Sequence, residues 1–391
     1  MKRAIAVIGA AFGDEGKGLM VDYFCRQAQE KPIVVRYNGG AQAGHTVVTP
    51  EGKRHVFHHF GAGTFAGADT YLSKHFLVNP TMFIKEYHEL SKPDINVFVH
   101  ASAPLTTVYD MFLNQKIEEA RALRHGSCGM GIHETMLRQQ IPLFALYARD
   151  VSQLNFIDYA IRAQSYATAR LIALGLGTDE NLAWLSNTDV LKEFLADCRQ
   201  FYDLIGFLNN EDALHKREVI FEGAQGLLLD QDNKRFFPHV THSKTGLHNV
   251  VEICQKASIT HVEACYVTRS YLTRHGAGEL PGEDPNLSYE DTTNQPNAWQ
   301  GTLRFAPQDW RLIDEAIRED FNANYNKFPS IDPQLAITHV DQCAEVTNDF
   351  YEVKIMVKYE SLGPTYKDVH VRDSVAQETL FESHSLRRQR I

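Results

Sequence analysis

Two glycine-rich segments near the start of the chain carry residue types that could bind phosphate and move a proton. The first, residues 9–18, reads Gly-Ala-Ala-Phe-Gly-Asp-Glu-Gly-Lys-Gly and follows a short apolar stretch. Glycines let backbone N–H groups approach an anion, the start of a following helix favours negative charge, and Lys17 adds a positive charge. The segment therefore predicts a phosphate-binding loop between a strand and a helix.

This loop departs from the regular Walker sequence. Ala11 replaces the first glycine, and Gly18 stands where a serine or threonine would hold magnesium. Asp14 offers the hard oxygen that magnesium prefers, so it is the expected metal ligand. Taken alone, the loop is also compatible with a plain strand-to-helix turn that binds nothing.

The second segment, residues 39–46, reads Gly-Gly-Ala-Gln-Ala-Gly-His-Thr and places a histidine after a tight glycine turn. Histidine can donate a proton or a hydrogen bond to a developing charge near neutral pH. A lone histidine is more often structural, so the case for His45 depends on the first loop lying opposite it.

Taken together, the two segments resemble the adenylosuccinate synthetase family. Further matches follow in the family's order at residues 221–226, 237–241, 273–278, 338–341 and 361–364, so the resemblance spans the chain from residue 4 to about residue 368. It implies an α/β fold with a mostly parallel central sheet, helices on both faces and a phosphate-binding loop. Ordered motifs over this length are far less expected by chance than any one of them.

The family's chemistry supplies the implied function, that of a carbon–nitrogen ligase. A nucleoside triphosphate, GTP or ATP, phosphorylates O6 of a purine monophosphate with Mg²⁺, and L-aspartate then displaces the phosphate; covalent activation divides a hard substitution into two easier ones. By resemblance, Asp14 takes the N1 proton and binds Mg²⁺, while His45 stabilises charge on O6 and the γ-phosphoryl group. Lys17 and Gly44 hold phosphates and metal.

The resemblance also assigns binding residues. The predicted substrate-binding residues are Gln42, Ser127, Cys128, Arg138, Gln225, Thr241, Thr302 and Arg304. The residues predicted to bind the triphosphate are Gly13, Glu15, Gly16, Lys17, Gly18, Gly44, Thr46, Asp341, Ser361, Gly363 and Pro364. Asp341 would read a guanine base, but the family's nearby lysine is His339 here, which leaves GTP and ATP open. Arg138 aligns with the arginine that reaches the neighbouring subunit's site, which implies a homodimer; a solvated helix residue is the alternative.

Some departures bear on the substrate. Cellular synthetases bind aspartate and the ribose with a run of arginines, whereas this chain keeps only Arg304 for a bidentate carboxylate clamp and has Thr302 where the ribose-contacting arginine is expected. The turn at residues 127–132 is also altered. These departures resemble the bacteriophage branch that joins aspartate to dGMP, and we favour dGMP as the substrate.

Many members of that branch replace the aspartate that corresponds to Asp14, however, so an IMP-dependent synthetase is the alternative. A regulator that has lost the reaction is a third reading, which the joint presence of Asp14, Lys17, His45 and Arg304 opposes.

Composition limits the partners and the compartment. The 391 residues carry a net charge of −10, which argues against sequence-independent binding to the phosphates of nucleic acid. The six cysteines form no CxxC pair, and no stretch suits a signal peptide or a membrane span, so we expect a cytoplasmic enzyme (host cytoplasm if viral). His55, His58 and His59 lie in one segment, but neighbouring strand residues face opposite sides, so packed or solvated roles are preferred to a metal site.

Apolar runs and helical periodicity outline one elaborated α/β domain over residues 1–391. A mainly helical insertion is expected at 91–215 and a substrate and aspartate loop at 276–305. Strands are expected at residues 4–9, 33–37, 95–100, 219–222, 265–268, 335–340 and 353–357. Helices are expected at residues 16–29, 80–90, 153–174, 189–207 and 310–318.

Overall fold

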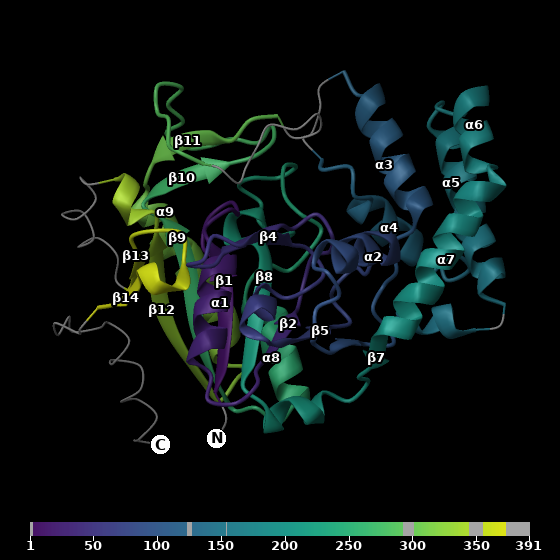
Figure 1. The fold of residues 1–391 in the computed structure, drawn as a ribbon. Helices are drawn as coiled ribbons and strands as arrows, with labels where there is room; N and C mark the ends of the chain where they lie inside the picture. Colours follow the sequence, from purple (N-terminus) through teal and green to yellow (C-terminus); the bar gives the residue numbers. More distant parts are fainter. Residues whose placement is uncertain (1–2, 123–126, 154, 292–300, 344–354, 373–391) are drawn as a thin grey trace.

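The computed structural model describes residues 3–122, 127–153, 155–291, 301–343 and 355–372. A ten-stranded sheet runs through this part of the chain in the order β14-β13-β12-β9-β1-β8-β2-β5-β6-β7 (Figure 1). All its strand pairs are parallel except β13 with β14. The predicted mostly parallel sheet is therefore confirmed.

The strands of this sheet differ widely in length, and the longest ones lie at its centre. Their bounds are β1 Ala4–Gly9, β2 Ile33–Arg36, β5 Asp69–Leu72, β6 Val97–Val99, β7 Ile205–Phe207, β8 Val219–Gly226, β9 His261–Arg269, β12 Ser330–Thr338, β13 Val357–Ser361 and β14 Val369–Val371. Two antiparallel pairs lie outside the sheet: β3 His45–Val48 with β4 Arg54–Phe57, and β10 Tyr271–Arg274 with β11 Arg304–Pro307.

Helices cover both faces of the sheet because its central strands are apolar on both sides. In β1, Ala4, Ala6 and Ile8 belong to one hydrophobic core, whereas Ile5 and Val7 belong to a second core. The first core includes α8 (Leu247–Lys256) and α9 (Trp310–Tyr325). The second includes α1 (Lys17–Gln27) and α2 (Pro80–Glu89).

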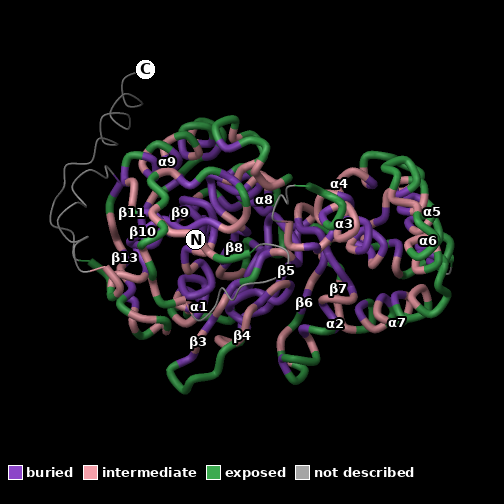
Figure 2. The backbone as a smooth tube through the Cα atoms, turned by 90° about the horizontal axis from the view of Figure 1, so that it is seen from above, coloured by how far each residue is buried: buried purple, intermediate pink, exposed green. Residues whose placement is uncertain are grey.

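The remaining helices gather beside the β7 edge of the sheet, away from β10 to β14 (Figures 1 and 2). They are α3 Val108–Ala120, α4 Ile132–Gln139, α5 Phe156–Ala173, α6 Asp179–Leu185 and α7 Thr188–Leu204. A core of their own joins α3, α5 and α6 through Tyr109, Leu113, Ala167 and Leu185. The region expected to be a helical insertion, 91–215, contains these five helices together with strands β6 and β7, of which β7 forms the edge of the sheet.

Several predicted boundaries are wrong. The helix expected at 189–207 ends at Leu204, and Ile205–Phe207 forms strand β7. The strand expected at 353–357 begins only at Val357, and residues 353 and 354 lie outside the described residues. Helix α9 continues to Tyr325, seven residues past its expected end.

Candidate functional site

A cavity of about 940 Å³ opens where β1, β8, β9 and β12 end. Parallel strands bring their carboxyl ends to one edge, where α/β proteins bind ligands. The cavity is lined by these predicted residues: Gly13, Asp14, Glu15, Gly16, Lys17, Gly18, Gln42, Gly44, His45, Thr46, Ser127, Cys128, Gln225, Thr241, Asp341, Ser361, Gly363 and Pro364. The two glycine segments therefore meet at one site, as the sequence predicted.

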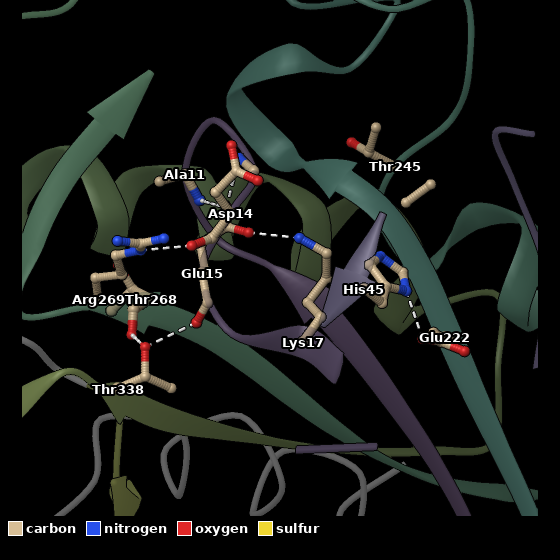
Figure 3. A network of polar contacts seen from close by, with 12 residues as sticks. Ala11, Asp14, Glu15, Lys17, His45, Glu222, Thr245, Thr268, Arg269 and Thr338 are labelled. Carbon is tan, nitrogen blue, oxygen red and sulfur yellow. Dashed lines mark hydrogen bonds and ion pairs between the residues drawn. The ribbon is translucent and has the colours of Figure 1, made fainter. Parts of the chain in front are cut away.

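The loop after β1 has an unusual backbone. Asp14 has a φ of 62°, a left-handed conformation that a non-glycine residue rarely adopts, and it follows Gly13 with a φ of 95°. Two side chains hold this conformation: Arg269 Nε donates to the Asp14 carbonyl oxygen, and Thr338 Oγ1 donates to the Glu15 carbonyl oxygen at 2.8 Å (Figure 3). Neighbouring strands thus fix the direction in which Asp14 points.

The carboxylate of Glu15 accepts hydrogen bonds from donors in its own loop. Its Oε1 accepts from the backbone N–H groups of Ala11 (3.1 Å) and Gly13 (2.8 Å), and its Oε2 accepts from Lys17 Nζ at 2.5 Å. Both charged side chains are buried, Lys17 at 3% and Glu15 at 2% exposure. Lys17 is therefore already paired with a carboxylate of its own loop in this structure.

His45 lies beside the start of α1 because Gly18 has no side chain: a Cβ there would come within 2.6 Å of the Thr46 carbonyl oxygen. The His45 ring is bound through Nδ1 to Glu222 Oε1 on strand β8 (Figure 3). Burial lowers the pKa of His45 to about 4, and the nearby Arg36 and Lys17 also lower it, against the opposing effect of Glu222. The ring is therefore neutral at pH 7.

Glu222 is fully buried and ionised. Burial alone would raise its pKa, but His45, Arg36 and the backbone N–H of Ala62 together lower it. That N–H donates to Oε2 at 3.0 Å, and the Arg36 guanidinium lies 4.0 Å from the same oxygen. A buried carboxylate on a histidine fixes the tautomer of the ring and stabilises its protonated form.

The Asp14 carboxylate has a histidine from another loop beside it. Its Oδ2 lies 3.5 Å from Nε2 of His275, in the loop after β10, and both residues line the cavity. Asp14 and the Gly44 backbone carbonyl supply oxygen atoms of the kind that magnesium prefers. Their presence on the same cavity fits the predicted metal ligands.

At the far end of the cavity, burial and the charge of Arg269 lower the pKa of His339 to about 3, although Asp291 opposes the shift. His339 is therefore neutral and brings none of the charge of the lysine that it replaces. Asp341 lines the cavity and is exposed.

Comparison with known proteins agrees with this geometry. Residues 6–385 match the sequence profile of adenylosuccinate synthetase. The chain belongs to the adenylosuccinate synthetase family. It is 28% identical to the synthetase of Buchnera aphidicola over 402 aligned positions, which cover 98% of this chain and 87% of that protein. The Picrophilus torridus synthetase is also 28% identical, over 92% of this chain and 81% of the relative.

Two solved structures share the fold of this family. The fully ligated adenylosuccinate synthetase of Plasmodium falciparum has a TM-score of 0.68 at 17% identity and covers 95% of this chain and 100% of its own. The succinoaminodeoxyadenylate synthetase of cyanophage S-2L, bound to dGMP and dATP, has a TM-score of 0.62 at 17% identity and covers 99% of both chains. Adenylosuccinate synthetases are carbon–nitrogen ligases that use a purine monophosphate, L-aspartate, a nucleoside triphosphate and Mg²⁺.

The expectation that Arg138 extends into a neighbouring synthetase subunit is wrong. Its side chain is fully buried and donates to both oxygens of Asp110, at 2.8 and 2.9 Å. Its remaining donors bind the carbonyl oxygens of Phe144 (2.7 Å) and Leu105 (2.6 Å). This arginine joins α3 to α4 within one chain, so it gives no support to a homodimer.

Two residues expected from the synthetase resemblance to contact aspartate or the ribose are Arg304 and Thr302. Thr302 is exposed and neither it nor Arg304 lines the cavity. Arg304 Nη2 donates to the carbonyl oxygens of Gly276 (2.7 Å) and Gly278 (2.5 Å), and Nη1 donates to Glu283 at 2.6 Å. In this conformation Arg304 holds the loop at residues 276–278, which lines the cavity, and its guanidinium is not available to bind the carboxylate of a ligand.

Other polar residues of the synthetase site were not assigned roles from the sequence. Glu222 and His275 lie inside motifs that the resemblance identified, whereas Arg269 lies outside all of them, and each of the three has a partner more than 170 residues away in the chain. Position within a motif was the only signal for Glu222 and His275, and Arg269 had none.

The histidines of the segment after β3 make contacts within the chain. His58 Nδ1 lies 3.0 Å from the carbonyl oxygens of Ala41 and Ala43. His59 Nε2 accepts from the backbone N–H of Asn79 at 2.9 Å. Within the described residues, no cluster of three metal-ligating side chains occurs, and no helix is long and apolar enough to cross a membrane.

Proposed function

We propose that the chain joins L-aspartate to C6 of dGMP, with hydrolysis of GTP or ATP through a 6-phosphoryl intermediate, and so forms N6-succino-2-amino-2′-deoxyadenylate. The observation that carries the chemistry is the meeting of Asp14, Lys17 and His45 in one cavity. A carboxylate base, a phosphate-binding cation and an imidazole are the groups that phosphoryl transfer to a purine oxygen requires.

The choice of dGMP depends on the ribose side of the site. Thr302 is outside the cavity and Arg304 donates to loop carbonyls, so neither offers a donor to a 2′-hydroxyl. If these two residues give the 2′-hydroxyl no donor, less is lost when that hydroxyl is absent, because neither of them is left unpaired. The phage synthetase of the same fold, which is bound to dGMP, is consistent with this choice.

In the proposed reaction, Asp14 takes the proton from purine N1, and O6 becomes nucleophilic toward the γ-phosphorus. Lys17 moves from Glu15 to the triphosphate. Phosphate charge in the cavity raises the pKa of His45, and Glu222 stabilises the protonated ring, which then donates to O6 and the transferred group. Asp14 and the Gly44 carbonyl oxygen would hold Mg²⁺, which would neutralise charge on the phosphates.

Gln42, Gln225, Thr241, Ser127 and Cys128 are proposed to bind the monophosphate, since all of them line the same cavity. Asp341, Ser361, Gly363 and Pro364 are proposed to hold the base of the triphosphate. A homodimer is proposed from the family alone, without a contribution from Arg138.

IMP is the second candidate substrate, because this chain keeps the Asp14 carboxylate and its curated relatives are adenylosuccinate synthetases. The deciding experiment incubates the protein with aspartate, Mg²⁺ and either GTP or ATP, together with dGMP or IMP. Mass spectrometry of the products measures how much of each nucleotide has been joined to aspartate. Efficient turnover of IMP without turnover of dGMP would show that the proposed substrate is wrong.

A second experiment tests the residue roles. Replacing His45 with Asn should leave substrate binding largely intact while lowering turnover by a factor on the order of 10² or more. Equal turnover in H45N and the unaltered enzyme would remove His45 from the mechanism.

A further inference from the structure

Two histidines from distant segments stack on each other at the wall of the cavity. His133 is the second residue of α4, and His242 lies in the loop that precedes α8. Both side chains line the cavity, and their ring centroids are 4.2 Å apart with the ring planes inclined by 31°. The stacking brings the start of α4 and this loop together beside the bound substrate of the proposed reaction.

The glycine turn that follows β2 meets both of these segments. A Cβ at Gly40 would come within 2.9 Å of Ile132 Cδ1, at the first position of α4. The backbone N–H of Gly39 donates to Ser243 Oγ at 3.3 Å. The turn, the start of α4 and the loop before α8 therefore form one corner of the cavity.

This corner contains polar groups that the protein itself does not pair. Both polar atoms of the Gln42 amide are buried and have no hydrogen-bond partner among the described residues. The His242 ring makes neither a hydrogen bond nor an ion pair within the described part of the chain, although its backbone is held by the bond from Thr241 N–H to the Leu229 carbonyl oxygen at 2.8 Å. Buried polar groups are normally paired, so the corner is suited to a polar ligand.

The charges nearby favour an anion as that ligand. Two arginines of the surrounding helices are paired with carboxylates: Arg121 Nη1 donates to Glu118 at 3.1 Å, and Arg170 Nε lies 3.4 Å from Glu134. Partial burial lowers the pKa of His242, and a neighbouring anion would raise it again. The His242 imidazole can therefore gain a positive charge when an anion binds.

The 5′-phosphate is the anion that this corner fits. A monophosphate ester carries a charge of about −1.5 to −2 at pH 7 and three acceptor oxygens. We infer that His242, held by stacking on His133, binds the 5′-phosphate of the purine monophosphate as an imidazolium. This assignment rests on the proposed monophosphate site at Gln42, Ser127 and Thr241. It does not depend on the choice between dGMP and IMP, because both carry the same phosphate.

The test compares dGMP with deoxyguanosine, which lacks only the phosphate, in the full chain. Calorimetric titration gives the affinity for dGMP, and competition against dGMP gives the affinity for deoxyguanosine. We expect H242N to weaken the binding of dGMP about 10- to 100-fold, the size of one charge-assisted hydrogen bond, and to leave the binding of deoxyguanosine unchanged. H242K keeps a positive charge and should weaken the binding of dGMP less than H242N does.

A matched control is H248N. His248 is exposed on α8 and does not line the cavity, so both affinities should stay at their wild-type values. Because His242 is exposed as well, its replacement should leave the fold intact, and thermal unfolding of each variant checks this. If H242N fails to fold, H242Q takes its place in the comparison.

The outcomes separate this inference from the proposed function. Equal losses of affinity for dGMP and deoxyguanosine would overturn the role of His242 at the phosphate, and equal losses in H242N and H242K would overturn its charge. A rise in the KM for aspartate or for the triphosphate alone would also overturn the inference, because His242 would then serve another substrate. If the enzyme uses IMP and rejects dGMP, the proposed substrate fails, and the same comparison of IMP with inosine still tests His242.

Discussion

Glu222 holds the Nδ1 atom of His45 inside the molecule, where the carboxylate is fully buried and the imidazole is 5% exposed. The strand that carries Glu222 is parallel and adjacent to β1, whose following loop carries Asp14. The imidazole is therefore oriented by the sheet itself, and the acid–base pair of the proposed reaction depends on the register of two strands.

Replacing Glu222 with Gln should lower turnover by roughly 10- to 100-fold while the KM values change little. The amide can still accept from Nδ1–H, but it no longer stabilises a protonated ring. Steady-state kinetics with all substrates varied gives both parameters. The control is E263Q, since Glu263 is paired with Arg3 at 2.8 Å and does not line the cavity. Similar losses in both variants would contradict a specific role for Glu222.

Folding stability should fall as the pH drops from about 6.5 to about 4. Burial holds the pKa of His45 at about 4, below its ordinary value of 6.5, so in this window the unfolded chain binds more protons than the folded chain. The contribution of this one residue is about 1.4 kcal/mol per pH unit. Urea denaturation at about pH 7 and about pH 5 measures it, and H45N should show a smaller loss. An identical pH dependence in H45N would exclude His45 as the source.

Replacing Arg138 with Met should destabilise the fold by about 3–5 kcal/mol, because Asp110 would keep a buried charge without its partner. Denaturant unfolding provides the free energy. The control is K192M, which breaks the exposed ion pair with Asp189 and should cause no measurable change. If R138M has the same free energy of unfolding as the unaltered chain but its oligomer is inactive, Arg138 acts across a subunit interface after all.

Replacing Arg304 with Lys should loosen the loop at residues 276–278. A lysine cannot reproduce the planar fork that binds two carbonyl oxygens and Glu283 together. We expect the KM for aspartate to rise severalfold, which corresponds to a loss of about 1 kcal/mol in binding because the loop is less well positioned. The KM for the triphosphate should rise less. R318K, at an ion pair with Asp314 on α9, serves as the control. Equal rises for every substrate would point to a general loss of structure.

Local sequence predicted the parts of the fold whose determinants are local. The apolar run of β1, the glycines after it and the helix that follows were found within two residues of their bounds. Helix α9 was expected to end at residue 318, yet it continues past Asn322 and Asn324, whose helix propensity is low, and Phe321 and Asn324 are buried. Packing outweighed propensity there.

Long-range pairing explains the other misses. Strand β13 alternates polar and apolar residues, with Tyr359 and Ser361 buried, and its position follows from parallel pairing with β12. The partner of Arg138 is 28 positions away, and an alignment cannot distinguish a buried ion pair from an arginine that reaches out. The same holds for Glu222 and His275, whose contacts depend on the order of strands in the sheet.

The ion pair between Glu15 and Lys17 also bears on which anions the loop admits. The Glu15 carboxylate competes with phosphate for the ammonium group of Lys17. Because it is tethered two residues away, its effective concentration is about millimolar or above and does not fall on dilution. An inorganic phosphate contacts only the loop, so it gains less from weakening this pair than a ligand that engages several parts of the cavity at once. The pair therefore favours a whole nucleotide over its fragments.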